Sequence, residues 1–211
     1  MRTHARIPNY KDKHCLRNNN RFCRNFAIKN IVFMILTDKR QIRRNVRAEI
    51  AILSTDEKST LSAQICSTLL HSQEVGDASV VALFISLTDE PETGEIIAEL
   101  AKTKRVVVPR IEGEEMEFYD IAEGVSEGAF GILEPLSTTP VEPSEIDVMV
   151  VPGVAFTQGG ERLGRGKGFY DKYLSRKGFR AHTIGICYPC QVVEYLPVEP
   201  HDKVLDKVVW G

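Results

Sequence analysis

The chain has 211 residues, of which 43% are apolar, and a formal net charge of −2, values that are ordinary for a globular protein. This length suits one domain or two small ones, and it allows a core that needs no disulfide or metal staples. Five cysteines, an odd number, favour reduced thiols over a disulfide framework. No stretch approaches the ~18 apolar residues of a membrane span, which argues against a membrane partner.

Residues 1–36 differ from the rest of the chain in charge. They hold eight basic residues and one acidic residue, a net charge of +7, whereas the remaining 19 basic and 28 acidic residues give −9. Three interpretations stay open: an extension upstream of a working start at Met34, a targeting segment, or a nucleic-acid arm. We expect this segment to be disordered in each case. The location should be cytoplasmic, or mitochondrial if the segment is a genuine transit peptide.

The next part of the chain alternates between helical and strand-like patterns. Apolar residues at spacings of three and four predict a basic amphipathic helix over 38–53, and "STDE" (Ser54–Glu57) has the form of a capping box that opens a second helix. The continuous apolar run at 79–87 predicts a buried strand. A helix is expected at 93–103, followed by a second buried strand at 105–109 that ends at its proline.

The second half continues the alternation. Residues 115–121 alternate between polar and apolar and predict an edge strand, and 146–153 is a third buried strand that stops at Pro-Gly. A helix is expected at 168–176, a fourth strand at 182–188, and a short apolar strand in the tail. Strands that are apolar on both faces and alternate with helices indicate an α/β fold. We predict a three-layer α/β/α architecture with a mostly parallel central sheet.

The stretch "GGERLGRGKGFYD" (Gly159–Asp171) lies between a predicted strand and a predicted helix, where α/β sheets bind their ligands. Glycines at alternate positions let backbone N–H groups approach an anion closely, and basic side chains add positive charge. These residues are Gly164, Gly166 and Gly168, with Arg162, Arg165 and Lys167. The pattern predicts a phosphate cradle, although it matches neither the P-loop nor the dinucleotide fingerprint. The alternative is a flexible basic hairpin in solvent.

"PGVAFTQGGERLGRGKGFYD" resembles the signature of the 5-formyltetrahydrofolate cyclo-ligase family. Further similar elements are "DKRQIRR", "SLTDEPET", "GILEP" and "LPVEPHD", which occur in the family's order and spacing. The resemblance covers residues 37–211, which we take as a single cyclo-ligase domain. One position departs from the family, because Phe169 stands where a tyrosine is frequent. A phenylalanine at this position can stack its ring on a ligand but has no hydroxyl to donate or accept a hydrogen bond.

The resemblance implies an enzyme that uses ATP and Mg²⁺ to convert 5-formyltetrahydrofolate into 5,10-methenyltetrahydrofolate. In this family the formyl oxygen attacks the γ-phosphate of ATP, N10 of the folate traps the phosphorylated group, and phosphate leaves. Such phosphoryl transfer requires mainly positioning and charge neutralisation. The expected partners are therefore small molecules and not nucleic acid, and a monomer is favoured over an oligomer.

The resemblance also assigns residues. For ATP it implies Lys39, Arg43, Arg162, Leu163, Gly164, Arg165, Gly166, Lys167, Gly168, Phe169 and Tyr170. For the folate it implies Ile85, Glu90, Arg165, Gly166, Lys167, Gly168 and Phe169. Arg165 and Lys167 are the candidates for stabilising charge on the transferred phosphoryl group. Asp171 and Asp202 are the candidate magnesium carboxylates, since Mg²⁺ typically takes one or two carboxylates with phosphate oxygens and water.

Each assignment has a plainer alternative. Lys39 and Arg43 share one helix face, which is also typical of a solvated basic surface. Asp171 has the position of a helix N-terminal charge, Asp202 that of a turn residue, and Ile85 that of a core residue. Two other functions compete with the cyclo-ligase: an isomerase-like enzyme on sugar phosphates, and a folate- or RNA-binding protein without catalysis. The "CYPC" pair at 187–190 lacks the second ligand pair of a zinc site and the position of a redox motif.

Overall fold

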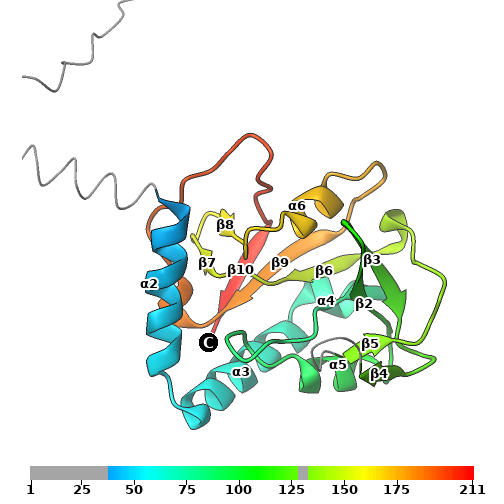
Figure 1. The fold of residues 1–211 in the computed structure, drawn as a ribbon. Coiled ribbons are helices and arrows are strands. Elements are labelled where there is room, and N and C mark those ends of the chain that lie inside the picture. Colours follow the sequence, from blue (N-terminus) through cyan, green and yellow to red (C-terminus); the bar gives the residue numbers. More distant parts are fainter. Residues whose placement is uncertain (1–37, 128–132) are drawn as a thin grey trace, which may run out of the picture.

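The computed structural model describes residues 38–127 and 133–211 (Figure 1). The predicted disorder of residues 1–36 lies outside the described residues. The helices of the described part are α2 (Lys39–Ile52), α3 (Thr55–Leu70), α4 (Gln73–Asp77), α5 (Gly94–Leu100) and α6 (Phe169–Leu174), with short 3-10 turns η2 (Pro143–Glu145) and η3 (Pro189–Gln191). The strands are β1 (Val80–Ala82), β2 (Arg105–Glu112), β3 (Glu115–Asp120), β4 (Val125–Glu127), β5 (Leu133–Pro135), β6 (Val148–Val151), β7 (Ala155–Phe156), β8 (Arg162–Leu163), β9 (His182–Cys187) and β10 (Lys207–Trp210).

A six-stranded sheet with the order β10-β9-β6-β1-β2-β3 forms the centre of the fold. All its neighbouring strands are parallel except β3, which pairs antiparallel with β2 at the edge. The prediction of a mostly parallel sheet with an edge strand at 115–121 is therefore confirmed. From β1 the chain proceeds through α5 to β2 on one side, while β6 lies on the other side of β1. Connections that leave in opposite directions open a crevice at the carboxyl ends of these strands.

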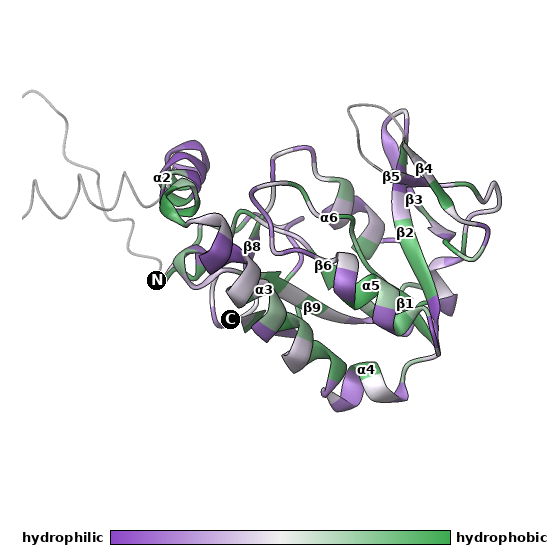
Figure 2. Cartoon of the chain, turned by 90° about the horizontal axis from the view of Figure 1, so that it is seen from below, coloured by the Kyte–Doolittle hydropathy of each residue, from purple (hydrophilic) through white to green (hydrophobic). Residues whose placement is uncertain are grey.

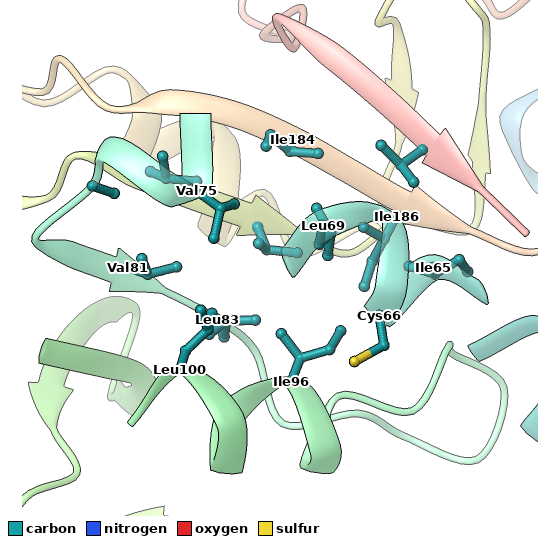
Figure 3. Close-up of a cluster of buried hydrophobic side chains, with 14 of the residues drawn as sticks. Ile65, Cys66, Leu69, Val75, Val81, Leu83, Ile96, Leu100, Ile184 and Ile186 are labelled. Atoms are coloured by element: carbon teal, nitrogen blue, oxygen red, sulfur yellow. The ribbon is translucent and has the colours of Figure 1, made fainter. Parts of the chain in front are cut away.

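Helices cover both faces of the sheet, which confirms the three layers. In Figure 1, α3 and α5 lie below the sheet and α6 lies above it. Ile65 and Leu69 of α3 and Ile96 of α5 pack on strand residues such as Val81 and Ile184 in one buried cluster, part of which Figure 3 shows. On the other face, Tyr173 of α6 belongs to a second cluster, which includes residues of β3 and β6.

Helix α2 lies beside the sheet and has two chemically different sides, as Figure 2 shows by its hydropathy. The apolar side is buried in a cluster that also contains Ala155 of β7 and Tyr188, which directly precedes η3. The residues that α2 contributes to this cluster are Ile42, Val46 and Ile50. Asp38 caps the helix by accepting a hydrogen bond from the backbone N–H of Arg40 at 2.8 Å. The predicted capping box of the next helix is also present, between Ser54 and Glu57.

Three predicted strands differ from those in the structure, and the one expected at 146–153 forms only over Val148–Val151. The run at 79–87 forms a strand only over Val80–Ala82, because the chain leaves its neighbours after a last hydrogen bond from the N–H of Leu83 to the carbonyl of Val107 and continues toward the crevice. The strand expected at 105–109 does not end at Pro109 but continues to Glu112. Proline is tolerated there because Pro109 lies beyond the last residue of β2 that pairs with β1, and on its other side it faces Phe118 of β3, whose carbonyl accepts from the N–H of Val141 instead.

Candidate active site

A cavity of about 510 Å³ opens over the carboxyl ends of β1, β2 and β6. Every residue that the sequence assigned to a ligand or to the metal lines this one cavity, from Lys39 on α2 to Asp202 near the end of the chain. The structure therefore brings together all the predicted site residues. They come from four separate segments, and the sheet places them at the switch point of its topology.

The glycine-rich loop is fixed at both ends. At its start, the carbonyl of Gly160 accepts a hydrogen bond from the N–H of Leu205 at 2.9 Å, and a Cβ at position 160 would collide with the carbonyl oxygen of Leu205. At its end, Gly168 has a positive φ of 73° and serves as the N-cap of α6. Both positions therefore favour glycine. The loop therefore has a defined conformation and forms part of the cavity wall, which argues against the alternative of a flexible hairpin in solvent.

Helix α2 supplies two cations to the cavity. The Nε of Arg43 donates to the carbonyl of Gly164 at 2.8 Å, and burial lowers the pKa of this guanidinium. The Nζ of Lys39 lies 2.7 Å from Asp202 and 3.1 Å from Glu199. Burial alone would lower the pKa of Lys39, but the hydrogen bonds that its ammonium donates to these carboxylates outweigh this effect and raise the pKa. These contacts argue against the alternative in which Lys39 and Arg43 only form part of a solvated basic surface.

Asp171 forms an ion pair with a buried arginine. The side chain of Arg162 is 4% exposed, and its guanidinium donates to Asp171 at 2.8 Å and to the carbonyl of Pro152 at 3.2 Å. The other oxygen of Asp171 accepts from the backbone N–H of Lys203 at 3.2 Å. The carboxylate thus connects the glycine loop, α6 and the segment that carries Asp202.

Arg165 makes ion pairs across the cavity to the segment that follows β1. Its Nε and a terminal nitrogen donate to one oxygen of Glu90 at 3.0 and 2.8 Å, and the same terminal nitrogen donates to Asp89 at 2.5 Å. The second oxygen of Glu90 accepts from the backbone N–H of Leu87 at 3.0 Å. Burial would raise the pKa of Asp89, but the hydrogen bond and charge of Arg165 outweigh it and hold that pKa below its usual value.

Lys167 is exposed, and within residues 38–127 and 133–211 no carboxylate forms an ion pair with it. It is therefore a lysine at the cavity whose charge is available to an anionic ligand. The same described residues contain no group of three or more His, Cys, Asp or Glu side chains arranged around a metal position. Asp171 and Asp202 fit Mg²⁺ in type, because this ion takes few protein carboxylates and completes its shell with phosphate oxygens and water.

Sequence reasoning missed the other residues of the cavity wall. They are Phe84, Leu87, Pro109, Ile111, Met116, Pro152, Gly153, Glu199 and His201. Most of them are apolar and either follow β1 or belong to the β2–β3 hairpin. One side of the cavity is therefore charged and the other side is apolar. For Pro109 and Pro152, the position at the carboxyl ends of predicted strands was the signal that would have indicated a place in the cavity wall.

The cysteine pair lies away from this chemistry. Neither Cys187 nor Cys190 lines the cavity, and both are free thiols. Cys187 is fully buried, and burial raises its pKa to about 12, which keeps the thiol protonated and unreactive. The structure gives no support to a redox or metal role for this pair.

The sheet and the cavity at its switch point place the chain among the α/β proteins that bind ligands at the carboxyl edge of a parallel sheet. Comparison with known proteins specifies the family. Residues 35–211 match the model of the 5-formyltetrahydrofolate cyclo-ligase family, and the chain belongs to this family. The resemblance found in the sequence is thus confirmed, and so is the prediction that the chain is an enzyme of this class.

Relatives agree with this assignment. The 5-formyltetrahydrofolate cyclo-ligase of Escherichia coli K12 is 32% identical over 174 residues, which are 78% of this chain and 95% of the relative. The mitochondrial 5-formyltetrahydrofolate cyclo-ligase of Arabidopsis thaliana is 28% identical and covers 83% of this chain and 74% of its own length. The NMR structure of Aquifex aeolicus 5,10-methenyltetrahydrofolate synthetase superposes with a TM-score of 0.73 at 34% identity, over 81% of this chain and 88% of that one.

Relatives therefore include a mitochondrial protein, and the location of this chain stays a prediction. Within the described residues, no helix combines the length and the apolar character that crossing a membrane requires.

Proposed function

We propose that this chain catalyses the ATP- and Mg²⁺-dependent cyclisation of 5-formyltetrahydrofolate to 5,10-methenyltetrahydrofolate, with release of ADP and phosphate, and that residues 37–211 form its single catalytic domain. Family membership supports the reaction. The observation that carries the ATP requirement is the cavity itself, where one side presents Lys39, Arg43 and Lys167 and the other presents apolar side chains. A phosphate chain and a pteridine ring need such complementary surfaces.

The charged side is suited to hold ATP. The cations of α2 and of the glycine loop neutralise the phosphates, and the loop's backbone N–H groups approach them without hindrance from side chains. Asp171 and Asp202 would hold Mg²⁺, which supplies charge neutralisation at the phosphate oxygens when it is bound. Lys167 is the residue best placed to stabilise charge on the transferred phosphoryl group, because no carboxylate in the described part of the chain neutralises it.

The apolar side is suited to hold the folate. Ile85, Ile111 and Met116 provide a surface for the pteridine ring, and the carboxylate of Glu90 can accept hydrogen bonds from its N–H groups. In this arrangement the formyl oxygen on N5 faces the phosphates. Attack of that oxygen on the γ-phosphate releases ADP, attack of N10 on the activated carbon closes the ring, and the phosphate leaves with the formyl oxygen.

The test uses the full chain, 5-formyltetrahydrofolate, ATP and Mg²⁺, with methenyl absorbance and released ADP measured together. We expect one ADP for each methenyl product and no product when ATP or Mg²⁺ is omitted. ATP-independent product, or none with all components present, would contradict the proposal. Turnover of a sugar phosphate without nucleotide would instead support the isomerase-like alternative. The cytoplasmic location and the monomeric state stay predictions beside this proposal.

A further inference from the structure

Asp89 contacts two arginines and was not among the predicted site residues. Its Oδ1 accepts from Arg165 at 2.5 Å, and its Oδ2 lies 3.8 Å from the Nε of Arg47 on α2. Asp89 therefore stands between the helix that carries Lys39 and Arg43 and the arginine of the glycine loop. The side chains of Asp89 and Arg165 are about one-third exposed, at 30% and 34%. They can rearrange without opening the core.

Glu90 is engaged by the same arginine and has no free carboxylate oxygen. One oxygen accepts two hydrogen bonds from Arg165, and the other accepts from the N–H of Leu87. The Glu90 side chain is only 7% exposed, and its backbone carbonyl accepts from the hydroxyl of Tyr188 at 3.0 Å, so the residue itself is fixed. A ligand that needs the oxygen now bonded to Arg165 requires the arginine to move and not the glutamate.

Arg165 also borders the phosphate side of the cavity, through the glycine loop to which it belongs. A guanidinium forms its strongest pairs with carboxylates and phosphates, in the same forked geometry. ATP phosphates and the two carboxylates therefore compete for this one side chain. When a phosphate binds Arg165, the Glu90 oxygen becomes available, and Asp89 keeps Arg47 as its partner.

We propose that Asp89 is a positioning residue that holds Arg165 against Glu90, and that this contact couples the two ligand subsites, so that nucleotide binding increases the affinity for the folate. The inference rests on the proposed function. Both ligands favour the arrangement in which Arg165 has left the carboxylates, and such coupling is reciprocal, since each ligand raises the affinity for the other by the same factor.

The test measures the dissociation constant of 5-formyltetrahydrofolate by calorimetry, with and without Mg²⁺ and a non-hydrolysable ATP analogue. For the unmodified chain we expect the analogue to tighten folate binding about tenfold, within the usual range of coupling. The Asp89→Asn substitution weakens the interaction that keeps Arg165 against Glu90. The folate alone should therefore bind several-fold more tightly, and the increase in folate affinity caused by the analogue should largely disappear. Asp89→Glu keeps a carboxylate and should keep the coupling.

Glu92→Gln is the matched control, because the substitution removes the same charge as Asp89→Asn. Glu92 is exposed and lies three residues further along the same segment. Its coupling factor should equal that of the unmodified chain. Tighter binding on loss of a carboxylate is a result that a damaged fold does not produce. Weaker or unchanged folate binding by Asp89→Asn, or an unchanged coupling factor, would overturn the inference. Measurable folate binding without any nucleotide effect in the unmodified chain overturns only this inference, whereas no folate binding under either condition sinks the proposed function as well.

Discussion

The two sides of the cavity are built differently. The charged side is assembled from α2, the glycine loop and the segment around Asp202, which are far apart in sequence and are joined by ion pairs such as Lys39–Asp202. The apolar side comes from the segment after β1 and from the β2–β3 hairpin, which is held by a continuous backbone ladder. The charged side thus depends on the chemistry of individual residues, and the apolar side on shape. Substitutions on the two sides should differ accordingly.

The largest effect is expected for Lys167→Ala on the charged side. Removing one group that stabilises developing charge typically costs about 10²–10³ in kcat. The side chain is exposed, so the melting temperature should stay within a few degrees of the unmodified value. Lys177→Ala removes an exposed lysine outside the cavity and should leave kcat unchanged. A Lys167→Ala enzyme that turns over at the original rate would remove Lys167 from the phosphoryl-transfer machinery.

Asp171→Asn should affect stability as well as activity. The substitution leaves Arg162, which is 4% exposed, without its carboxylate, and breaking a buried ion pair costs roughly 3 kcal/mol of unfolding free energy. Urea denaturation measures this loss. Glu99→Gln breaks the exposed pair with Lys102 and should cost less than about 1 kcal/mol. Equal midpoints for Asp171→Asn and the unmodified chain would mean that the Arg162 pair contributes nothing to the fold.

Ile111→Ser tests the apolar side. Ile111 is 48% exposed, so about half of its side chain is available to a ligand, and the lost contact is worth ~1 kcal/mol. We expect the KM for the folate to rise about five- to tenfold, with kcat and the KM for ATP unchanged. Ile52→Ser, at a 79% exposed position outside the cavity, is the control. A rise in the KM for ATP instead would reverse the assignment of the two sides.

Phe169→Tyr should have the smallest effect. The added hydroxyl restores the residue that is frequent in the family, at a half-buried position on the cavity wall where it can stay hydrated. We expect less than about 0.5 kcal/mol on unfolding and less than about a twofold change in either KM. A tenfold change in the KM for the folate would show that a hydroxyl at this position contacts the substrate.

The glycine loop and the helix starts could be predicted from the sequence because these features are local, whereas Lys39, Arg43, Asp171 and Asp202 were assigned through the family resemblance. Asp38 and the Ser54–Glu57 box mark helix starts, and the glycines that allow the loop's shape lie within ten residues of one another. Apart from Ile85, which the resemblance assigned, the residues of the apolar side were missed for a non-local reason. Whether Ile111 lines a cavity or a core depends on where the neighbouring strand β1 stops, and its own sequence does not show this. The early end of β1 is set by where its pairing with β2 and β6 stops, and β2 is longer than its apolar run because it pairs with β3 as far as Glu112.

The ion pair between Lys39 and Asp202 joins residues that are 163 positions apart. During synthesis, α2 and the glycine loop emerge well before Asp202, and domains fold as their segments become available. A chain that is interrupted before this point carries the cationic loop without the carboxylate that neutralises Lys39 and is proposed to hold the metal. Under the proposed function, a chain that ends before Asp202 lacks one of the two carboxylates proposed to hold Mg²⁺, and we expect it not to consume ATP.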